Sequence, residues 1–136
     1  MTGTVERAFW EQDGMYLSQI AGADITLGKV VEIGSTDGYV VVSSSASTQA
    51  LGVAIAGYRT SRTAIDNQIA SGNLVTVATR GVVNLSVANG TVTRGELVYT
   101  YGTEGGIATG ATDVSKVLGL ALSTGTEVVK VKLMRG

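Results

Sequence analysis

Gly28-Lys29-Val30-Val31 recurs in the second part of the chain as Gly95-Glu96-Leu97-Val98, and the following stretches recur at the same offset. Asp37-Gly38-Tyr39-Val40 matches Glu104-Gly105-Gly106-Ile107, and Ala50 to Ala54 matches Val117 to Ala121. The identical residues, named in the first copy, are Gly28, Val31, Thr36, Gly38, Leu51, Gly52 and Ala54. One long period in 136 residues predicts two similar β-meanders around one core, because a solenoid needs three or more shorter units.

The two copies differ in one place. The first runs through residues 58–71 before it reaches Gly72 to Gly81, whereas the second goes almost directly to Gly125 to Gly136. We therefore expect an internal repeat of residues 28–81 and 95–136, in which residues 58–71 form an excursion that only the first copy has. Within the excursion, the four-residue spacing of Ile65 and Ile69 predicts a short helix over residues 63–70.

Composition predicts an all-β fold. The 44% hydrophobic content is mostly Val, Ala, Leu and Ile, with 19 Gly and few aromatic residues, as strands and tight turns require. About ten short strands are expected, at residues 15–20, 28–34, 39–44, 50–56, 74–79, 82–87, 97–101, 106–109, 116–122 and 127–134. Short strands between glycine-bearing turns predict a compact β-barrel or β-tulip built from two related halves, a single domain over residues 15–136.

Local signals add turns and edges to this prediction. Asp37-Gly38 and Asn89-Gly90 tolerate positive φ and predict two-residue hairpin turns. Proline is absent from the chain, so no proline protects an edge strand by removing a hydrogen-bond donor. That absence favours an assembled state, in which a partner subunit covers the edges.

Residue types exclude most functions that depend on chemistry. The chain has no Cys and no His, which removes thiolate nucleophiles, disulfides and the commonest general base and metal ligands. The 11 acidic residues are scattered, so neither an enzyme nor a cofactor is expected. A net charge of −1, without a basic cluster, argues against nucleic acid, and strand-length apolar runs argue against a membrane span. The N-terminus lacks a signal-peptide pattern, which predicts synthesis in the cytoplasm.

The segment before Met15 shows no clear periodicity, and residues 1–14 are expected to form an extended N-terminal arm. They hold the chain's only Phe and only Trp, as Phe9-Trp10. The pair is interpreted in two ways, as the anchor of an arm that meets a partner or as a lid on the end of the barrel. Successive residues of a strand face opposite sides, so in either case one ring faces away from the surface that the other contacts.

With these motifs in view, the chain resembles the capsid decoration (cement) proteins of tailed viruses, of the small β-barrel or β-tulip type. The family pattern orders Gly-x-Val-Val, Val-Gly-Val-Ala, Gly-x-x-Val-x-Val and Gly-Val-Val strands, then repeats the first two and ends on Val-x-Val-x-Leu. The matching stretches are Gly28 to Val31, Leu51 to Ala54, Gly72 to Val77, Gly81 to Val83, Gly95 to Val98, Leu118 to Ala121 and Val129 to Leu133. The longer excursion at residues 58–71 departs from the pattern, as does the lack of a tail after the last strand.

The resemblance implies a structural virion protein without catalytic activity. Such proteins bind the outside of an icosahedral shell, typically as homotrimers at local three-fold positions, and stabilise the mature capsid. The implied partners are the major capsid protein and further copies of the chain. Family members use an N-terminal arm or an adjacent strand to engage the capsid protein by β-augmentation.

Five residues are candidates for capsid or subunit contact: Arg7, Phe9, Trp10, Arg59 and Arg62. Solvated loop charges are the simpler interpretation of the two arginines of the excursion.

Two further groups have alternative interpretations. Tyr99 and Tyr101 share one strand face, which fits packing or a sugar-stacking platform in a carbohydrate- or receptor-binding module of a head or tail fibre. Four Asp residues suggest Ca²⁺, but none lies in a ligand-dense loop, so no metal is expected; they are Asp13, Asp24, Asp37 and Asp66.

Overall fold

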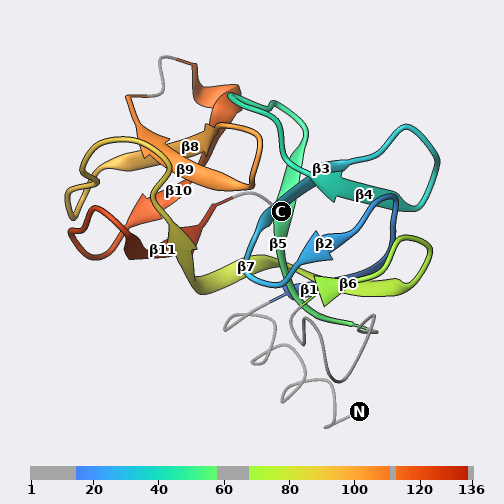
Figure 1. Ribbon diagram of the computed structural model, residues 1–136. Helices are drawn as coiled ribbons and strands as arrows, with labels where there is room; N and C mark the ends of the chain where they lie inside the picture. The colour runs from blue at the N-terminus through green and yellow to red at the C-terminus, as the bar shows by residue number, and fades with distance from the viewer. Residues whose placement is uncertain (1–14, 58–67, 111–112, 135–136) are drawn as a thin grey trace, which may run out of the picture.

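The computed structural model describes residues 15–57, 68–110 and 113–134, which form two groups of strands side by side with β7 between them (Figure 1). These residues form eleven strands and one short 3-10 helix, η1 (Val114–Lys116). The strands are β1 (Met15–Ala21), β2 (Ile25–Thr26), β3 (Val30–Ile33), β4 (Tyr39–Val42), β5 (Ala50–Gly57), β6 (Gln68–Ile69), β7 (Leu74–Ser86), β8 (Leu97–Tyr101), β9 (Gly106–Thr109), β10 (Val117–Ala121) and β11 (Val128–Leu133). The all-β prediction is confirmed.

One sheet of nine strands contains most of the chain, in the order β1-β4-β3-β5-β7-β11-β10-β8-β9. β1 also pairs antiparallel with β7, and this pairing closes β1, β4, β3, β5 and β7 into a five-stranded barrel. Closure leaves fewer unpaired edges than an open sheet would have. The two short strands β2 and β6, which the sequence did not predict, pair with each other.

The second group of strands follows the same plan. After β7, the strands β11, β10, β8 and β9 succeed one another, and a parallel bridge joins Val87, just beyond β7, to Ile107 in β9. This bridge corresponds to the parallel pairing of β1 with β4 at Ala21 and Val40. We call residues 15–80 the first half and residues 81–134 the second half.

β7 belongs to both halves. Its first part pairs with β1 as far as Arg80 and with β5 as far as Ala78, and its second part, from Gly81, pairs with β11. The sequence predicted two strands here, separated near Arg80, and this prediction is wrong. Gly81 has φ of +105°, a conformation open to glycine, and the strand passes through it without ending.

The duplication extends to individual backbone hydrogen bonds. The Gly28 amide donates to the Ala54 carbonyl at 2.7 Å, and the Gly95 amide donates to the Ala121 carbonyl at 2.8 Å. The starts of β3, β4 and β5 precede those of β8, β9 and β10, respectively, by one constant offset, the offset of the sequence repeat. The equivalence also includes β1, whose counterpart is the second part of β7. The Ala21 amide donates to the Asn73 carbonyl, and in the same way the Val87 amide donates to the Glu127 carbonyl.

The core consists of two clusters of buried apolar side chains. One lies within the first half and includes Val31, Val40 and Val77. The other lies mainly within the second half, around residues such as Leu118. Three first-half residues, Val30, Ala50 and Val53, belong to this second cluster, so the outer face of β3 and β5 is covered by the second half.

Several local predictions are corrected. Gln68 and Ile69 form strand β6 and not the end of a helix, because Ile69 pairs with Ile25 and is buried; residues 63–67 of the predicted helix lie outside the described residues. Gly38 has φ of +82°, but the turn spans four residues between the bonded Gly34 and Tyr39, not two. Gly90 also has a positive φ, of +68°, yet the chain beyond it bridges from Val92 to Gly125 and forms no hairpin.

Candidate functional site

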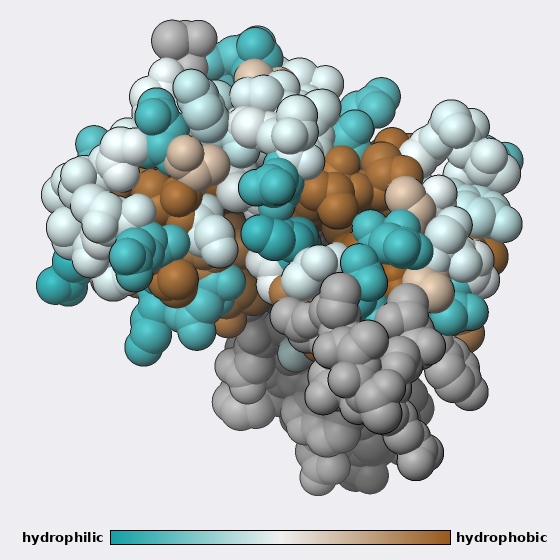
Figure 2. Space-filling view, viewed as in Figure 1, coloured by the Kyte–Doolittle hydropathy of each residue, from teal (hydrophilic) through white to brown (hydrophobic). Residues whose placement is uncertain are grey.

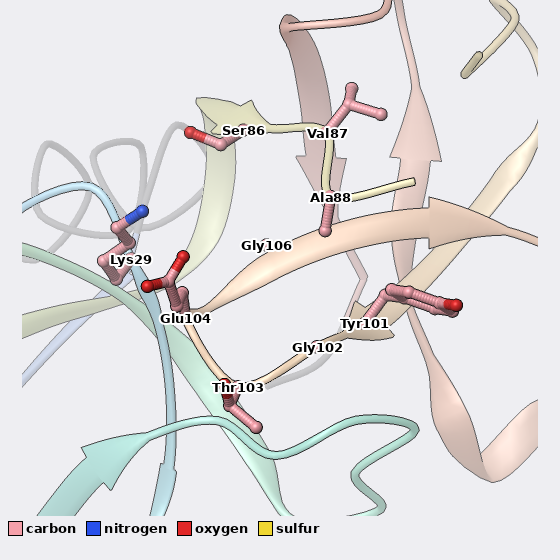
Figure 3. Close-up of a pocket in the computed structure, with 9 residues that line it drawn as sticks. All are labelled: Lys29, Ser86, Val87, Ala88, Tyr101, Gly102, Thr103, Glu104 and Gly106. Carbon is pink, nitrogen blue, oxygen red and sulfur yellow. The ribbon is translucent and has the colours of Figure 1, made fainter. Parts of the chain in front are cut away.

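A hollow lies where the second half meets the first. Its volume is about 470 Å³, and residues from both halves line it, as Figure 3 shows. The end of β8 and the turn after it supply Tyr101 to Glu104, and the end of β7 and the two residues after it supply Ser86 to Ala88. Lys29 lies directly before β3. A second hollow of about 260 Å³ shares Lys29, Thr103 and Glu104 with it.

The chemistry in these hollows is simple. Lys29 and Glu104 lie next to each other on one side of the larger hollow, and Tyr101 lies on the other side (Figure 3). One ammonium, one carboxylate and one phenol offer charge and hydrogen bonding to a small polar group. The arrangement can hold a polar group of a partner by charge and hydrogen bonding.

Tyr99 and Tyr101 contact each other on β8. Their ring centroids are 6.2 Å apart and the ring planes are 82° to one another, the edge-to-face geometry that aromatic pairs favour. Both side chains are half-buried. Perpendicular rings do not form one flat platform, so the pair fits packing better than the stacking of a sugar on both rings.

Exposed apolar side chains recur at equivalent positions of the two halves. Tyr16 of β1 corresponds to Val82 of β7. Tyr16 pairs with Ala78, and Val82 pairs with Lys132, the residue of the second half that is equivalent to Ala78. All of the following are exposed: Tyr16 and Val82, Leu74 and Val128, Ile55 and Leu122. Figure 2 shows such brown side chains among teal ones on the second half, at the left.

The structure leaves the predicted contact residues untested. Arg7, Phe9, Trp10, Arg59 and Arg62 all lie outside the described residues, as do Asp13 and Asp66. The other two Asp residues considered for Ca²⁺ have local roles. An Asp24 carboxylate oxygen accepts a hydrogen bond from the Ser71 amide, and Asp37 lies in the turn before β4.

Residues 15–57, 68–110 and 113–134 contain no group of three acidic, His or Cys side chains that could hold a metal ion. Within the same ranges, no helix is long and apolar enough to cross a membrane.

Comparison with protein families identifies the chain. The sequence model of the XM1 gp53 minor capsid protein family matches residues 10–133. The chain belongs to this family. It is therefore a phage capsid-associated protein with a structural role in the phage head.

A solved structure has a similar fold to this member of the XM1 gp53 family. The crystal structure of the N base of head fibre gp8.5 from bacteriophage phi29 superposes with a TM-score of 0.53. The match covers 90% of this chain and 96% of that chain, at 15% sequence identity. At this identity the likeness concerns the fold alone. A comparison with curated proteins gives no match.

Proposed function

We propose that this protein is a capsid decoration protein, which binds the outer surface of the head and stabilises the mature shell. The observation that carries the proposal is membership of a minor capsid family over residues 10–133. The described surface supports it, because it presents exposed apolar sheet positions in both halves. The partners are the major capsid protein and two further copies, in homotrimers at local three-fold positions.

Multivalency explains how a small protein can stabilise a shell. A single arm or edge that buries one or two aromatic rings gains a binding free energy comparable to the cost of association. Three subunits in one trimer make the second and third contacts intramolecular and raise the apparent affinity by orders of magnitude. Each bound trimer then joins neighbouring capsid proteins, so stability rises with every occupied position.

β1 is the strand best placed to accept a capsid segment. Within the described residues, β1 pairs with β4 only at Ile20 and Ala21. Tyr16 to Gln19 pair with β7 on one side and have no strand beside them on the side of β4. An exposed edge strand is a template for β-augmentation. The edge directly follows residues 1–14, so arm residues Arg7, Phe9 and Trp10 and this edge act on one capsid surface. Arg59 and Arg62 are proposed to contribute from the excursion.

The first test is stoichiometry. Mass spectrometry of purified particles should give close to one copy of this protein per major capsid subunit if it occupies the whole lattice. A few per cent instead would mean a component of a vertex, fibre or tail, and absence from particles would overturn the proposal.

The second test removes the arm. A variant that lacks residues 1–14 should keep the far-ultraviolet circular dichroism of a β-protein and lose binding to undecorated shells in a sedimentation assay. Phe9→Ala with Trp10→Ala in the full chain is the matched control for the two rings. Full occupancy by the truncated protein would refute a role for the arm, whereas a lowered melting temperature would favour the lid interpretation.

A carbohydrate- or receptor-binding role in a head fibre is the second candidate. The hollow beside Tyr101, of about 470 Å³, favours it. Glycan-array binding by the isolated protein, lost in Tyr101→Ala and kept in Tyr16→Ala, would support this function. Uniform absence of glycan binding would remove it.

A further inference from the structure

Within one chain, the second half docks on a defined surface of the first. We call this surface the first-half socket, made of Val30, Val53 and Ser47. The Val30 amide donates to the Gly105 carbonyl at 3.1 Å, and the Ser47 amide donates to Thr100 Oγ1 at 2.8 Å. The docking element is the β8–β9 hairpin, residues 100–105, which we call the second-half plug. All three socket residues are buried, at 0%, 1% and 8% exposed.

The second half has the same socket, and it is uncovered. Register and offset place Leu97 where the first half has Val30, Leu120 in place of Val53, and Val114 in place of Ser47. Leu97 is 45% exposed and Val114 is 87% exposed, and Leu120 is half-buried. Two of these apolar side chains are thus exposed and the third is half-buried, at positions whose counterparts are covered.

The first half also has the matching plug, and this too is uncovered. It is the β3–β4 hairpin, residues 33–38, which corresponds to residues 100–105. Thr100 is fully buried against the first half, whereas its counterpart Ile33 is 53% exposed. A plug that presents the exposed Ile33 and a socket that presents the exposed Leu97 and Val114 therefore lie on one molecule. Figure 1 shows the β3–β4 hairpin at the right, on the side of the first half away from the second half, so this plug does not reach the socket of its own chain.

We infer that the second-half socket receives the first-half plug of another copy of this chain, head to tail. The intrachain contact brings Thr100 to Ser47, and the same two positions between copies carry the exposed apolar side chains Ile33 and Val114. A heterologous contact of this kind leaves one plug and one socket free at the ends of each oligomer, and a ring forms where the rotation closes. The number of copies rests on the proposed trimer, but the surface and the orientation do not.

Charge sets the contact between copies apart from the contact within a chain. Lys29 lies beside Glu104 at the intrachain contact, since both line the hollow there and the Lys29 side chain abuts Gly105. The corresponding residues between copies are Glu96 and Asp37, which repel each other. At the edge of the second-half socket, Lys132 pairs with Leu120, whereas in the first half Ala78 pairs with Val53. The contact between copies is therefore weak in free solution, strengthens with added salt and gains from the high local concentration on a shell.

Cross-linking tests the contact directly, because the chain has no native Cys. The double variant Ile33→Cys with Val114→Cys copies the contact of Thr100 with Ser47, whose Oγ1 and amide N are 2.8 Å apart. Mild oxidation of the protein at high concentration, and of protein bound to shells, should give disulfide-linked oligomers on non-reducing gels, with a trimer limit for a three-membered ring. Monomer alone under both conditions would overturn the inference.

Charged substitutions test its direction. In this cross-linking background, Leu120→Asp blocks the socket and Glu96→Lys restores the intrachain charge pattern. We expect at least about a tenfold loss of oligomer from the first change and about a tenfold gain from the second. Val82→Asp is the matched control, because Val82 and its counterpart Tyr16 are exposed in both halves and lie outside the contact. Equal losses in Val82→Asp and Leu120→Asp would overturn the inference.

A mixing experiment separates head-to-tail from face-to-face contact. Ile33→Asp retains an intact socket and Leu97→Asp retains an intact plug, so each alone should stay monomeric and a mixture should form heterodimers that go no further. Homo-oligomers of Ile33→Asp would overturn the inference, because they would mean that the sockets meet each other. Shell binding is measured in parallel: binding without cross-links refutes only this contact, and cross-links without shell binding refute only the proposed decoration function.

Discussion

In the first half, Val30 and Val53 lie beneath the second half and are at most 1% exposed. At the same strand positions of the second half, Leu97 is 45% exposed and Leu120 is half-buried. The strands that carry them begin at one constant offset and form the same hydrogen bonds. The backbone therefore does not decide whether these apolar residues are buried. What decides it is whether another half is available to cover the sheet face, and a single chain supplies only one cover for two such faces.

The largest expected effect tests whether the two halves are held by the same close approach. A Cβ added at Gly52 would collide with the carbonyl oxygen of Ala78, and one added at Gly119 would collide with that of Lys132. Gly52→Ala and Gly119→Ala should each lower the free energy of unfolding by about 3 kcal/mol or more, measured by urea denaturation. A loss of less than about 1 kcal/mol in only one of the halves would mean that their strands are not equivalently packed.

The next effect compares equivalent residues that are buried in the first half and exposed in the second. Val30→Ala removes a fully buried side chain and should lower the free energy of unfolding by about 2 to 3 kcal/mol. Leu97→Ala at the equivalent exposed position should change it by about 0.5 kcal/mol or less in dilute monomer. Thermal denaturation of both variants at low concentration checks the pair. Equal losses would contradict the difference in cover.

A smaller effect isolates the hydrogen bond between the halves. Thr100→Val leaves the buried Ser47 amide without its acceptor and should destabilise the protein by roughly 1 to 2 kcal/mol. The reciprocal change, Ile33→Thr, gives the first-half hairpin the residue of the second and should be within about 0.5 kcal/mol of neutral for the monomer. Amide hydrogen exchange at Ser47 reports the local loss, and unchanged protection in Thr100→Val would count against the bond.

The smallest effect concerns the second-half loop that carries Asp113 and Val114, the counterpart of the first-half loop that carries the buried Ser47. The Ser115 amide donates to an Asp113 carboxylate oxygen at 3.0 Å, and this backbone hydrogen bond, with a further one from the Ser115 side chain, lowers the pKa of Asp113. A lowered pKa means that the bond stabilises the loop above the ordinary Asp pKa, and that this contribution is lost as the pH falls through the lowered value. An NMR titration of the Asp113 carboxyl and the Ser115 amide should show both shifts together. Asp113→Asn should remove the pH dependence of the Ser115 shift.

Much of the fold could be predicted from the sequence because three consecutive strands repeat at one offset. The starts of β8 and β9 agree with the predicted residues, since glycines and alternating apolar residues mark them. The extension of the repeat back to β1 was missed. When Ala21 is aligned with Val87, β1 and its counterpart in β7 share no identical residue. Their equivalence is seen only in the way the two strands pair with their neighbours.

The failures have physical causes. Two Ile residues four apart fit a helix or an irregular segment equally well, and Ile69 takes strand geometry because Ile25, far away in the sequence, pairs with it. Arg80-Gly81 suggested a break, but glycine can bend a strand without ending it. The second-half socket could not be found from sequence, because Val30 and Leu97 are both apolar and only the fold reveals which one is covered.

The continuity of β7 has a mechanical consequence. Thirteen residues run without interruption from the wall of one half into the wall of the other, so no linker separates the two. A load applied to either half passes along a hydrogen-bonded strand, and the halves cannot swing apart unless β7 loses pairing with β5 or β11. If the two halves bind different capsid proteins, the chain resists the separation of those proteins as a rigid connection and not as a flexible one. It yields only when the hydrogen bonds between β7 and its neighbouring strands break.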